Sequence, residues 1–460
     1  MTDVAEKLRD AGMSAREADR KAALFVEGER GLARLGRGGP DVRYWVPGRI
    51  EVLGKHTDYA GGRSLLCTIE RGFCFAAARR DDDVLRISDA RLGETIEIPL
   101  RADTRGRSGH WSAYPTTVAQ RLAANFDSAG LGDSATRRLG DSATLVGADV
   151  VFVSDLPIAA GISSSSALVV GTYSVLAAIN RLGERAEFRE SIADNESLAE
   201  YLGAVENGLT YRALAGEHGV GTFGGSEDHT AMLCAEPSKL VQYSFCPVRR
   251  ERAVGLGGDL VFAIAASGVV AEKTGAALSS YNRVASLARE ALAAWNRATL
   301  GDDATLADAL RSAGNVEALV FAIESSTMAD GFSAGELVER VRQFAIESER
   351  LIPAAGDALA MRRLDTFAEI VDESMRNAVE MLHNQTPETI FLAEQARALG
   401  AIAASAFGAG FGGSVWALVG RDRAAGFLSA WDDEYRARFP DLAKAEFFLT
   451  EAGIPATRLR

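Results

Sequence analysis

Residues 154–168 read SDLPIAAGISSSSAL, and this stretch ends one apolar segment and opens another. The segment before it, 147–157, is rich in β-branched residues and closes on a proline, which predicts a buried strand. The segment after it, 161–183, predicts a long helix. A strand that turns through small residues into a helix start directs free backbone N–H groups at an anion, and the helix dipole favours negative charge there. One serine would cap the helix, so four serines behind a glycine favour an anion site.

Apolar patterns on the two sides of this stretch have different periods. Residues 43–79 contain apolar runs bounded by turn residues, which predicts strands. Most of 302–403 has apolar residues three or four apart, which predicts helices, and one of these can begin at Thr386 because proline follows it in the first turn. Mixed elements without strict βαβ alternation favour an α+β fold. We therefore expect a strand-rich unit over 1–245 and a helix-rich α+β unit over 246–460.

Composition and charge argue against several classes of partner. The chain has 460 residues, 47% of them hydrophobic, which is ample for a buried core. The net charge of -13 argues against nucleic acid and against an anionic membrane surface. Apolar stretches such as 260–271 are too short to span a bilayer, and the charged N-terminus lacks the apolar core of a signal peptide. The four cysteines form no CxxC pair, so we expect free thiols and a cytoplasmic protein.

Two further glycine-containing stretches have only a superficial likeness to nucleotide loops. Five residues separate Gly48 from Gly54, and a histidine follows Lys55, so neither the spacing nor the final residue fits a phosphate loop. GAGFGG at 408–413 has dinucleotide spacing, but it follows a predicted helix and precedes a predicted strand, which is the reverse of the order that motif requires. A metal site at the nearby histidine and aspartate of the first stretch lacks a third ligand at suitable spacing.

Three stretches taken in order carry a more specific signal. PGRIEVLGKHTDYAGG at 47–62, LPIAAGISSSSAL at 156–168 and SAFGAGFGGS at 405–414 resemble the three motifs of the GHMP small-molecule kinases. The first is similar to the galactokinase signature, and AVEN at 204–207 and GGSEDH at 224–229 resemble two further family segments. The resemblance implies a two-domain GHMP kinase fold with an ATP-binding helix and the active site between the domains. It also implies that the γ-phosphoryl of ATP, with Mg²⁺, goes to the anomeric hydroxyl of galactose or a related sugar.

The resemblance also implies roles for individual residues. Asp228 matches the catalytic aspartate that accepts the hydroxyl proton, and Arg49 matches an arginine that pairs with it and stabilises phosphoryl charge. Mg²⁺ is expected on Ser165 and Glu206. Ser166 stands where the family has an alanine, which leaves open a shift of the alignment by one residue. The spacing between Glu206 and Asp228 is longer than in the family, which leaves Glu217 as a rival Mg²⁺ ligand. The implied ATP-binding residues are Ala159, Ala160, Gly161, Ile162, Ser163, Ser164, Ser165, Ser166, Gly408, Gly410 and Gly412.

The implied sugar-binding residues depart from the family at one position. They are Lys55, His56, Asp58, Gly225 and Tyr281. Lys55 stands where galactokinases have a glutamate that accepts from the hydroxyl on the sixth carbon, and lysine has no acceptor. An acidic sugar would suit a lysine there. Alternatively Lys55 pairs with Glu51 or another acid and never touches substrate.

Other positions around the pocket differ as well, since Glu51 replaces an asparagine and His229 a glutamine. These departures leave open a uronic acid, a heptose or arabinose as the acceptor. A sensor that binds sugar and ATP without turnover is the remaining alternative, although the presence of Asp228 and Arg49 argues against it. We expect a small-molecule sugar as the partner, with no nucleic acid or membrane, and the sequence leaves the oligomeric state open.

Overall fold

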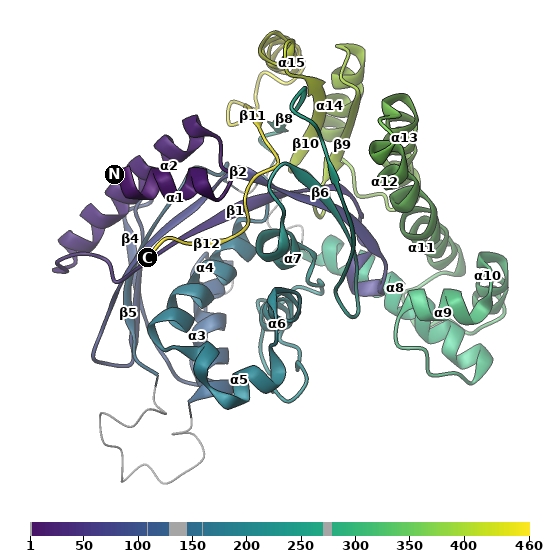
Figure 1. The fold of residues 1–460 in the computed structure, drawn as a ribbon. Coiled ribbons are helices and arrows are strands. Elements are labelled where there is room, and N and C mark those ends of the chain that lie inside the picture. Colours follow the sequence, from purple (N-terminus) through teal and green to yellow (C-terminus); the bar gives the residue numbers. More distant parts are fainter. Residues whose placement is uncertain (1, 108, 128–144, 159, 270–277) are drawn as a thin grey trace.

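The computed structural model describes residues 2–107, 109–127, 145–158, 160–269 and 278–460 (Figure 1). Its larger sheet has the strand order β12-β1-β2-β5-β3-β4, and β6 joins it through β2 and carries β7 at its other edge. All neighbours are antiparallel except β3 and β5. The strands are β1 (Val42–Leu53), β2 (Arg63–Arg79), β3 (Val84–Asp89), β4 (Glu94–Pro99), β5 (Ala148–Ser154), β6 (Lys239–Ser244), β7 (Arg249–Gly255) and β12 (Thr457–Arg458).

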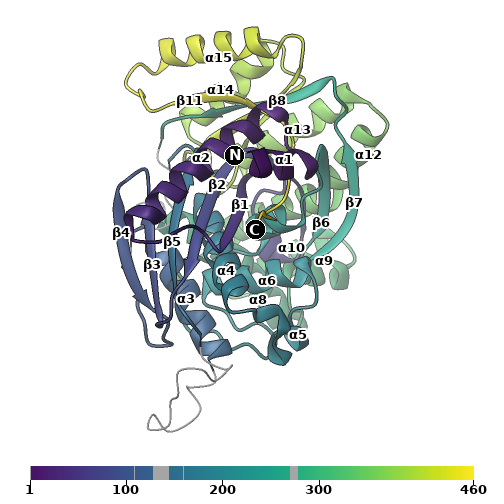
Figure 2. The same ribbon diagram turned by 60° about the vertical axis from the view of Figure 1, so that its left-hand side comes forward.

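Helices cover both faces of this sheet (Figures 1 and 2). Phe75 of β2 faces α4, where Gly171 allows close packing because a Cβ there would lie 2.1 Å from the Phe75 ring. The next residue, Ala76, packs with Leu32 of α2 on the opposite face, as strand alternation requires. The helices around this sheet are α1 (Thr2–Asp10), α2 (Ala15–Arg34), α3 (Ala113–Phe126), α4 (Ser164–Ile179), α5 (Ala186–Ser191), α6 (Asn195–Asn207) and α7 (Glu227–Cys234).

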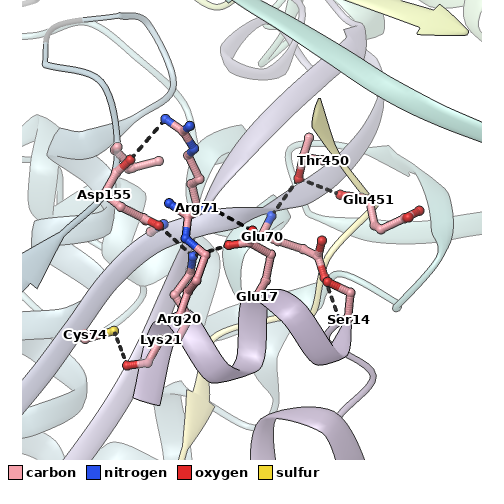
Figure 3. A network of polar contacts seen from close by, with 12 residues as sticks. Ser14, Glu17, Arg20, Lys21, Glu70, Arg71, Cys74, Asp155, Thr450 and Glu451 are labelled. Atoms are coloured by element: carbon pink, nitrogen blue, oxygen red, sulfur yellow. Dashed lines mark hydrogen bonds and ion pairs between the residues drawn. The ribbon is translucent and has the colours of Figure 1, made fainter. Parts of the chain in front are cut away.

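A polar network attaches α2 to the sheet (Figure 3). The Lys21 side chain is fully buried, and its Nζ lies 2.8 Å from Glu17 and 2.6 Å from Asp155. Nearby, the Glu70 carboxylate accepts a hydrogen bond from the Ser14 backbone N–H, while the Glu70 N–H donates to the Thr450 hydroxyl. A buried ammonium requires such partners, because an unpaired charge in the interior is strongly unfavourable. The network therefore joins α2, β2 and the strand β11 (Glu446–Thr450).

The second sheet has the order β11-β8-β10-β9 and is antiparallel throughout. Its strands are β8 (Leu260–Ala266), β9 (Ala403–Phe407), β10 (Ser414–Gly420) and β11 (Glu446–Thr450). Its core includes the buried Trp431 of α15, while Trp416 of β10 belongs to the main core that it shares with the large sheet. The remaining helices are α8 (Leu278–Thr299), α9 (Leu306–Ala313), α10 (Val316–Glu324), α11 (Ala334–Ala345), α12 (Ile352–Ala360), α13 (Leu364–Glu380), α14 (Pro387–Ala398) and α15 (Ala424–Arg438).

These elements confirm the α+β class expected from the sequence. The predicted helical region 302–403 contains α9 to α14, and α14 begins after Thr386, whose side chain caps it. The boundary expected near residue 245 falls between β6 and β7, which pair with each other, and β12 at the chain end returns to the larger sheet. A division into 1–245 and 246–460 therefore stays a proposal. No helix in the described ranges is long and apolar enough to cross a membrane.

Candidate active site

A polar cleft lies where eight segments of the chain meet. They are the end of β1, the turn that follows it, the first turn of α4, the last turn of α6, the loop between α6 and α7, the start of α7, α8 and the β9–β10 turn. The lining residues are Arg49, Glu51, His56, Asp58, Tyr59, Ser166, Glu206, Asn207, Thr222, Gly224, Gly225, Glu227, Asp228, His229, Tyr281, Gly408 and Ala409.

Arg49 and Asp228 form a buried ion pair in this cleft. Arg49 Nε lies 2.7 Å from Asp228 Oδ1, and a second guanidinium nitrogen donates to the Gly161 carbonyl at 2.8 Å. Burial by itself lowers the pKa of Arg49, but the carboxylates of Asp228, Glu227 and Glu51 outweigh it and raise the pKa above its ordinary value. The arginine is therefore a fixed positive charge that links β1, α7 and the loop before α4.

Ser166 and Glu206 meet beside this pair. Ser166 Oγ donates to Glu206 Oε2 at 2.9 Å and to Asp228 Oδ2 at 3.3 Å, and His229 Nε2 lies 3.0 Å from Glu206 Oε2. Ser165 does not line the cleft. The serine that meets the acidic groups is therefore Ser166, one residue later than the motif alignment implies. Glu217 lies outside the cleft with a side chain 69% exposed, so it is Glu206 that the fold brings to Asp228.

The described residues contain no cluster of three or more His, Cys, Asp or Glu side chains arranged to hold a metal ion. Mg²⁺ does not require one, because it keeps several waters and takes one or two carboxylates together with phosphate oxygens. The adjoining hydroxyl of Ser166 and carboxylate of Glu206 are hard oxygen donors of this kind. The residues present therefore fit Mg²⁺ bound together with a nucleotide.

The two glycine-rich motifs pack against each other. Ser163, just before α4, has a φ of 59°, and Gly161 has a φ of 70°. Ser414 Oγ donates to the Ala160 carbonyl at 2.6 Å, and a Cβ on Gly408 would lie 2.8 Å from the Gly161 carbonyl oxygen. Gly410 and Gly412 continue the β9–β10 turn with φ values of 78° and 122°. The backbones of the two motifs approach so closely at Gly408 and Gly161 that a side chain at Gly408 would clash. The β9–β10 turn therefore faces the start of α4.

Most ATP-binding residues expected from the sequence lie in these two turns. Ala160, Gly161, Ile162 and Ser163 precede α4, while Ser164, Ser165 and Ser166 form its first turn. Ala159 is outside the described residues.

The expected sugar-binding residues, apart from Lys55, also come together. His56 Nε2 is 3.0 Å from the Ala409 carbonyl, its Nδ1 is 3.0 Å from the Tyr59 hydroxyl, and its ring centroid is 5.6 Å from that of Tyr281. Asp58 Oδ2 accepts the N–H of Glu227 at 3.0 Å. A Cβ on Gly225 would lie 2.2 Å from that same Asp58 oxygen, so only glycine fits there.

Lys55 points away from the cleft. It is 1% exposed, and its Nζ donates to Ser374 Oγ of α13 at 3.1 Å. The Ser374 hydroxyl in turn donates to Glu347 Oε1 at 2.9 Å, and that oxygen also accepts the Gly54 N–H at 3.0 Å. Lys55 thus lies outside the cleft lining, hydrogen-bonded to a serine rather than to an acid, although its charge acts on the nearby Glu51. An acidic sugar loses the group that suggested it.

Two cleft carboxyls were not expected as site residues. Burial raises the pKa of Glu51 to about 7, although the charges of Lys55 and Arg49 oppose the rise. Burial, followed by the neighbouring Glu51 and Asp58, raises the pKa of Glu227 well above its ordinary value. A signal for Glu51 was available, because it lies two residues after Arg49 and a strand places such residues on one face. Glu227 could be found only as the neighbour of Asp228.

Asn207 of α6 is a further cleft residue that sequence reasoning missed as a site residue. Its Oδ1 accepts hydrogen bonds from the Gly224 N–H at 2.8 Å and from the Thr222 hydroxyl at 2.9 Å. It therefore orders the loop that leads into α7. Its place in the AVEN segment, directly after Glu206, was the available signal.

Comparison with known proteins gives the same family as the motifs. Three family models match: the galactokinase galactose-binding signature at 34–79, the GHMP kinase N-terminal domain at 125–211 and the GHMP kinase C-terminal domain at 355–437. A galactokinase of Roseiflexus sp. (strain RS-1) is 27% identical over 387 residues, which cover 83% of this chain and 84% of the relative. A galactokinase of Chloroflexus aurantiacus is 26% identical over 404 residues, with 85% and 87% covered.

Solved structures agree on the fold. The crystal structure of Lactococcus lactis galactokinase complexed with galactose has a TM-score of 0.71 and 23% identity, and the match covers 93% of this chain and 98% of that chain. Mevalonate kinase of Methanococcus jannaschii has a TM-score of 0.53 at 12% identity, with 90% and 99% covered. Motifs, cleft and relatives agree, and the chain belongs to the GHMP kinase superfamily, in its galactokinase-like branch.

Proposed function

We infer that this protein is an ATP-dependent sugar kinase that transfers the γ-phosphoryl of ATP to the anomeric hydroxyl of galactose or a closely related sugar. The observation that carries this inference is the buried Arg49–Asp228 pair, 2.7 Å apart, in a cleft between a serine-rich helix start and a cluster of sugar-compatible side chains. The galactokinase relatives, matched over most of both chains, support the same activity.

In this proposal Asp228 accepts the proton of the sugar hydroxyl as that oxygen attacks phosphorus. A carboxylate within hydrogen-bond reach of the reacting hydroxyl suits this general-base task. Arg49 supplies a fixed positive charge beside the transferred phosphoryl, where charge spreads over the equatorial oxygens. His56 and Asp58 hold the sugar hydroxyls in fixed directions, and Tyr281 contributes an aromatic wall.

ATP lies with its phosphates at the first turn of α4, under the β9–β10 turn. Backbone N–H groups at a helix N-terminus and the positive end of its dipole favour phosphate there. Ser166 and Glu206 hold Mg²⁺, which neutralises phosphate charge when bound. Ser165 is the neighbouring alternative given by the motif register. We place the reaction in the cytoplasm, where ATP is available and the four free thiols stay reduced.

An ADP-release assay with purified protein, Mg-ATP and a panel of sugars tests this function. The panel contains galactose, arabinose, a heptose and a hexuronic acid. We expect turnover with galactose or a neutral relative. Tight binding of sugar and ATP without turnover on any member of the panel would instead identify a sensor.

A further inference from the structure

His56 lies where two turns of the cleft meet. It belongs to the turn after β1, residues 54–62, and its Nε2 lies 3.0 Å from the carbonyl oxygen of Ala409 in the β9–β10 turn. A carbonyl oxygen can only accept a hydrogen bond, so this contact requires a proton on Nε2. The other ring nitrogen, Nδ1, lies 3.0 Å from the Tyr59 hydroxyl. In the neutral imidazole Nδ1 is then an acceptor, and Tyr59 donates to it.

The Tyr59 hydroxyl is held in this donating role from its other side. Arg340 of α11 places Nη2 3.4 Å from the Tyr59 hydroxyl oxygen, and a guanidinium can only donate. Burial raises the pKa of Tyr59 to about 12, so the hydroxyl keeps its proton at neutral pH. The hydrogen bonds therefore run in one direction, from Arg340 through Tyr59 to His56 and on to the carbonyl of the β9–β10 turn.

Arg340 also holds the backbone of the turn after β1. Its Nη2 donates to the His56 carbonyl, and Gln343, one helical turn further on, donates to the Lys55 carbonyl at 3.2 Å. His56 has a φ of 59°, a conformation that residues other than glycine rarely adopt and that persists where neighbouring contacts hold it. Arg340 is fully buried, and apolar residues of similar size often stabilise a buried position at least as well as a charged one. Its contacts thus indicate a task at the cleft rather than in the core.

A proton fixed on Nε2 leaves a donor and an acceptor side by side in the cleft lining. His56 and Ala409 both line the cleft. A sugar hydroxyl can accept from Nε2 and donate to the carbonyl, because a hydroxyl does both. With the proton on Nδ1, Nε2 and the carbonyl oxygen would be two acceptors in contact, and the hydroxyl would lack a donor at this point.

We propose that Tyr59 and Arg340 are positioning residues of the acceptor site, which act through His56 by keeping its proton on Nε2 and its backbone in the left-handed conformation. This proposal rests on the sugar kinase function inferred above. It brings in Arg340, which does not line the cleft and lies 284 positions from His56 in the chain.

Tyr59→Phe removes the donating hydroxyl and keeps the ring. We expect the galactose KM to rise by roughly 2- to 10-fold, the usual effect of losing a hydrogen bond between neutral groups, with a smaller change in kcat and in the KM for ATP. NMR of protein with isotope-labelled histidine nitrogens shows the tautomer directly, and His56→Gln identifies the signal. At mildly alkaline pH the wild-type His56 should be protonated on Nε2, whereas Tyr59→Phe should populate both tautomers.

Two variants of Arg340 test the other positioning residue. Arg340→Met removes every donor, and it should raise the galactose KM at least as much as Tyr59→Phe does. Arg340→Lys should restore part of the loss, because an ammonium can still donate but lacks the fork that reaches two oxygens. Thermal melting verifies that each variant is folded, and Tyr59→Phe carries the test if Arg340→Met does not fold.

The matched control is Tyr243→Phe. It removes a buried tyrosine hydroxyl that donates to the Cys234 carbonyl at 2.6 Å, outside the cleft lining. The galactose KM and the His56 tautomer should both stay as in wild type. Wild-type His56 protonated on Nδ1 would overturn the proposal, and so would an unchanged galactose KM in Tyr59→Phe.

The kinase function and this proposal fail differently. Absence of turnover with every sugar would remove the kinase function, while the tautomer and the calorimetric affinity for galactose would still decide whether Tyr59 and Arg340 act through His56. Turnover with an unchanged tautomer and galactose KM in Tyr59→Phe would keep the kinase function and remove both residues from acceptor positioning.

Discussion

Arg49 Nε lies 2.7 Å from Asp228 Oδ1, although 179 positions separate the two residues in the chain. Arg49 comes from strand β1 and Asp228 from the first turn of α7, so the packing of α7 against β1 creates the pair. A charged pair this deeply buried needs both members, because either one alone would be an uncompensated charge. Its position in the polar cleft makes it the centre of the proposed chemistry.

Replacing Asp228 tests the proposed base. Asp228→Asn keeps the shape of the side chain but cannot accept the proton, so we expect kcat to fall by roughly 100- to 10,000-fold. ATP and sugar affinities, measured by calorimetry, should change far less. A variant that keeps wild-type turnover would exclude Asp228 from the proton transfer.

The Mg²⁺ assignment predicts a contrast between two glutamates. Glu206→Gln should raise the Mg²⁺ concentration needed for half-maximal turnover by at least about tenfold, since losing even a residue that only supports a metal ligand typically costs about 10- to 100-fold in metal affinity. Glu217→Gln, on the exposed surface, should leave the titration unchanged. Binding of Mn²⁺ to the enzyme–nucleotide complex, followed by electron paramagnetic resonance, gives a readout independent of activity. Equal effects in both variants would contradict the assignment.

The same titration distinguishes the two serines. Ser166→Ala removes the hydroxyl that donates to Glu206 at 2.9 Å, whereas Ser165→Ala changes a serine outside the cleft lining. We expect the Mg²⁺ requirement to rise only in Ser166→Ala. If the Mg²⁺ requirement instead rises only in Ser165→Ala, Ser165 is the ligand, as the motif alignment implies.

Lys55 is predicted to act on stability rather than on sugar recognition. Lys55→Met removes a buried ammonium near Glu51 and Glu347, and leaving buried acids without their cation costs roughly 3 to 5 kcal/mol. Denaturant unfolding should show this loss. Lys55→Glu should destabilise the fold at least as much, since it adds a carboxyl to the same buried region. An improvement in galactose turnover in Lys55→Glu, with stability retained, would show that position 55 contacts the sugar.

Glu51 predicts a pH dependence of stability. Burial raises its pKa from an ordinary 4.5 to about 7, against the attraction of Lys55 and Arg49, with Glu347 and Glu227 also facing it. An acid whose pKa is higher in the folded state binds its proton more tightly there. Stability should therefore fall as the pH rises from about 4.5 to about 7, and this contribution should be level above that range.

The corresponding variant is Glu51→Gln, which cannot titrate. The decline in unfolding free energy between pH 5 and pH 7 should become smaller by on the order of 1 to 3 kcal/mol. The exposed Glu446→Gln serves as the control and should follow the wild-type profile. If the wild-type and Glu51→Gln profiles run parallel, Glu51 is already ionised in the folded protein near pH 5.

Features that depend on residues close together in the chain could be predicted from the sequence. Apolar runs predicted the strands within 43–79, and the periodic segments predicted the helices of 302–403. Thr386 caps α14 through its own side chain, with proline in the next position. The order of the three motifs predicted the family, since each motif is a turn whose conformation its own glycines and serines permit.

The sequence by itself thus determined the α+β class, the family and the segments that form the cleft. Only the tertiary structure decided which side chains enter it. Lys55 turns toward Ser374, which is 319 positions away, and Ser166 rather than Ser165 meets Glu206, because helix packing fixes which face of α4 is turned to α6. Glu51 and Glu227 share one buried region for the same reason. Burial and partner charges are set by contacts distant in sequence, and local pattern does not encode them.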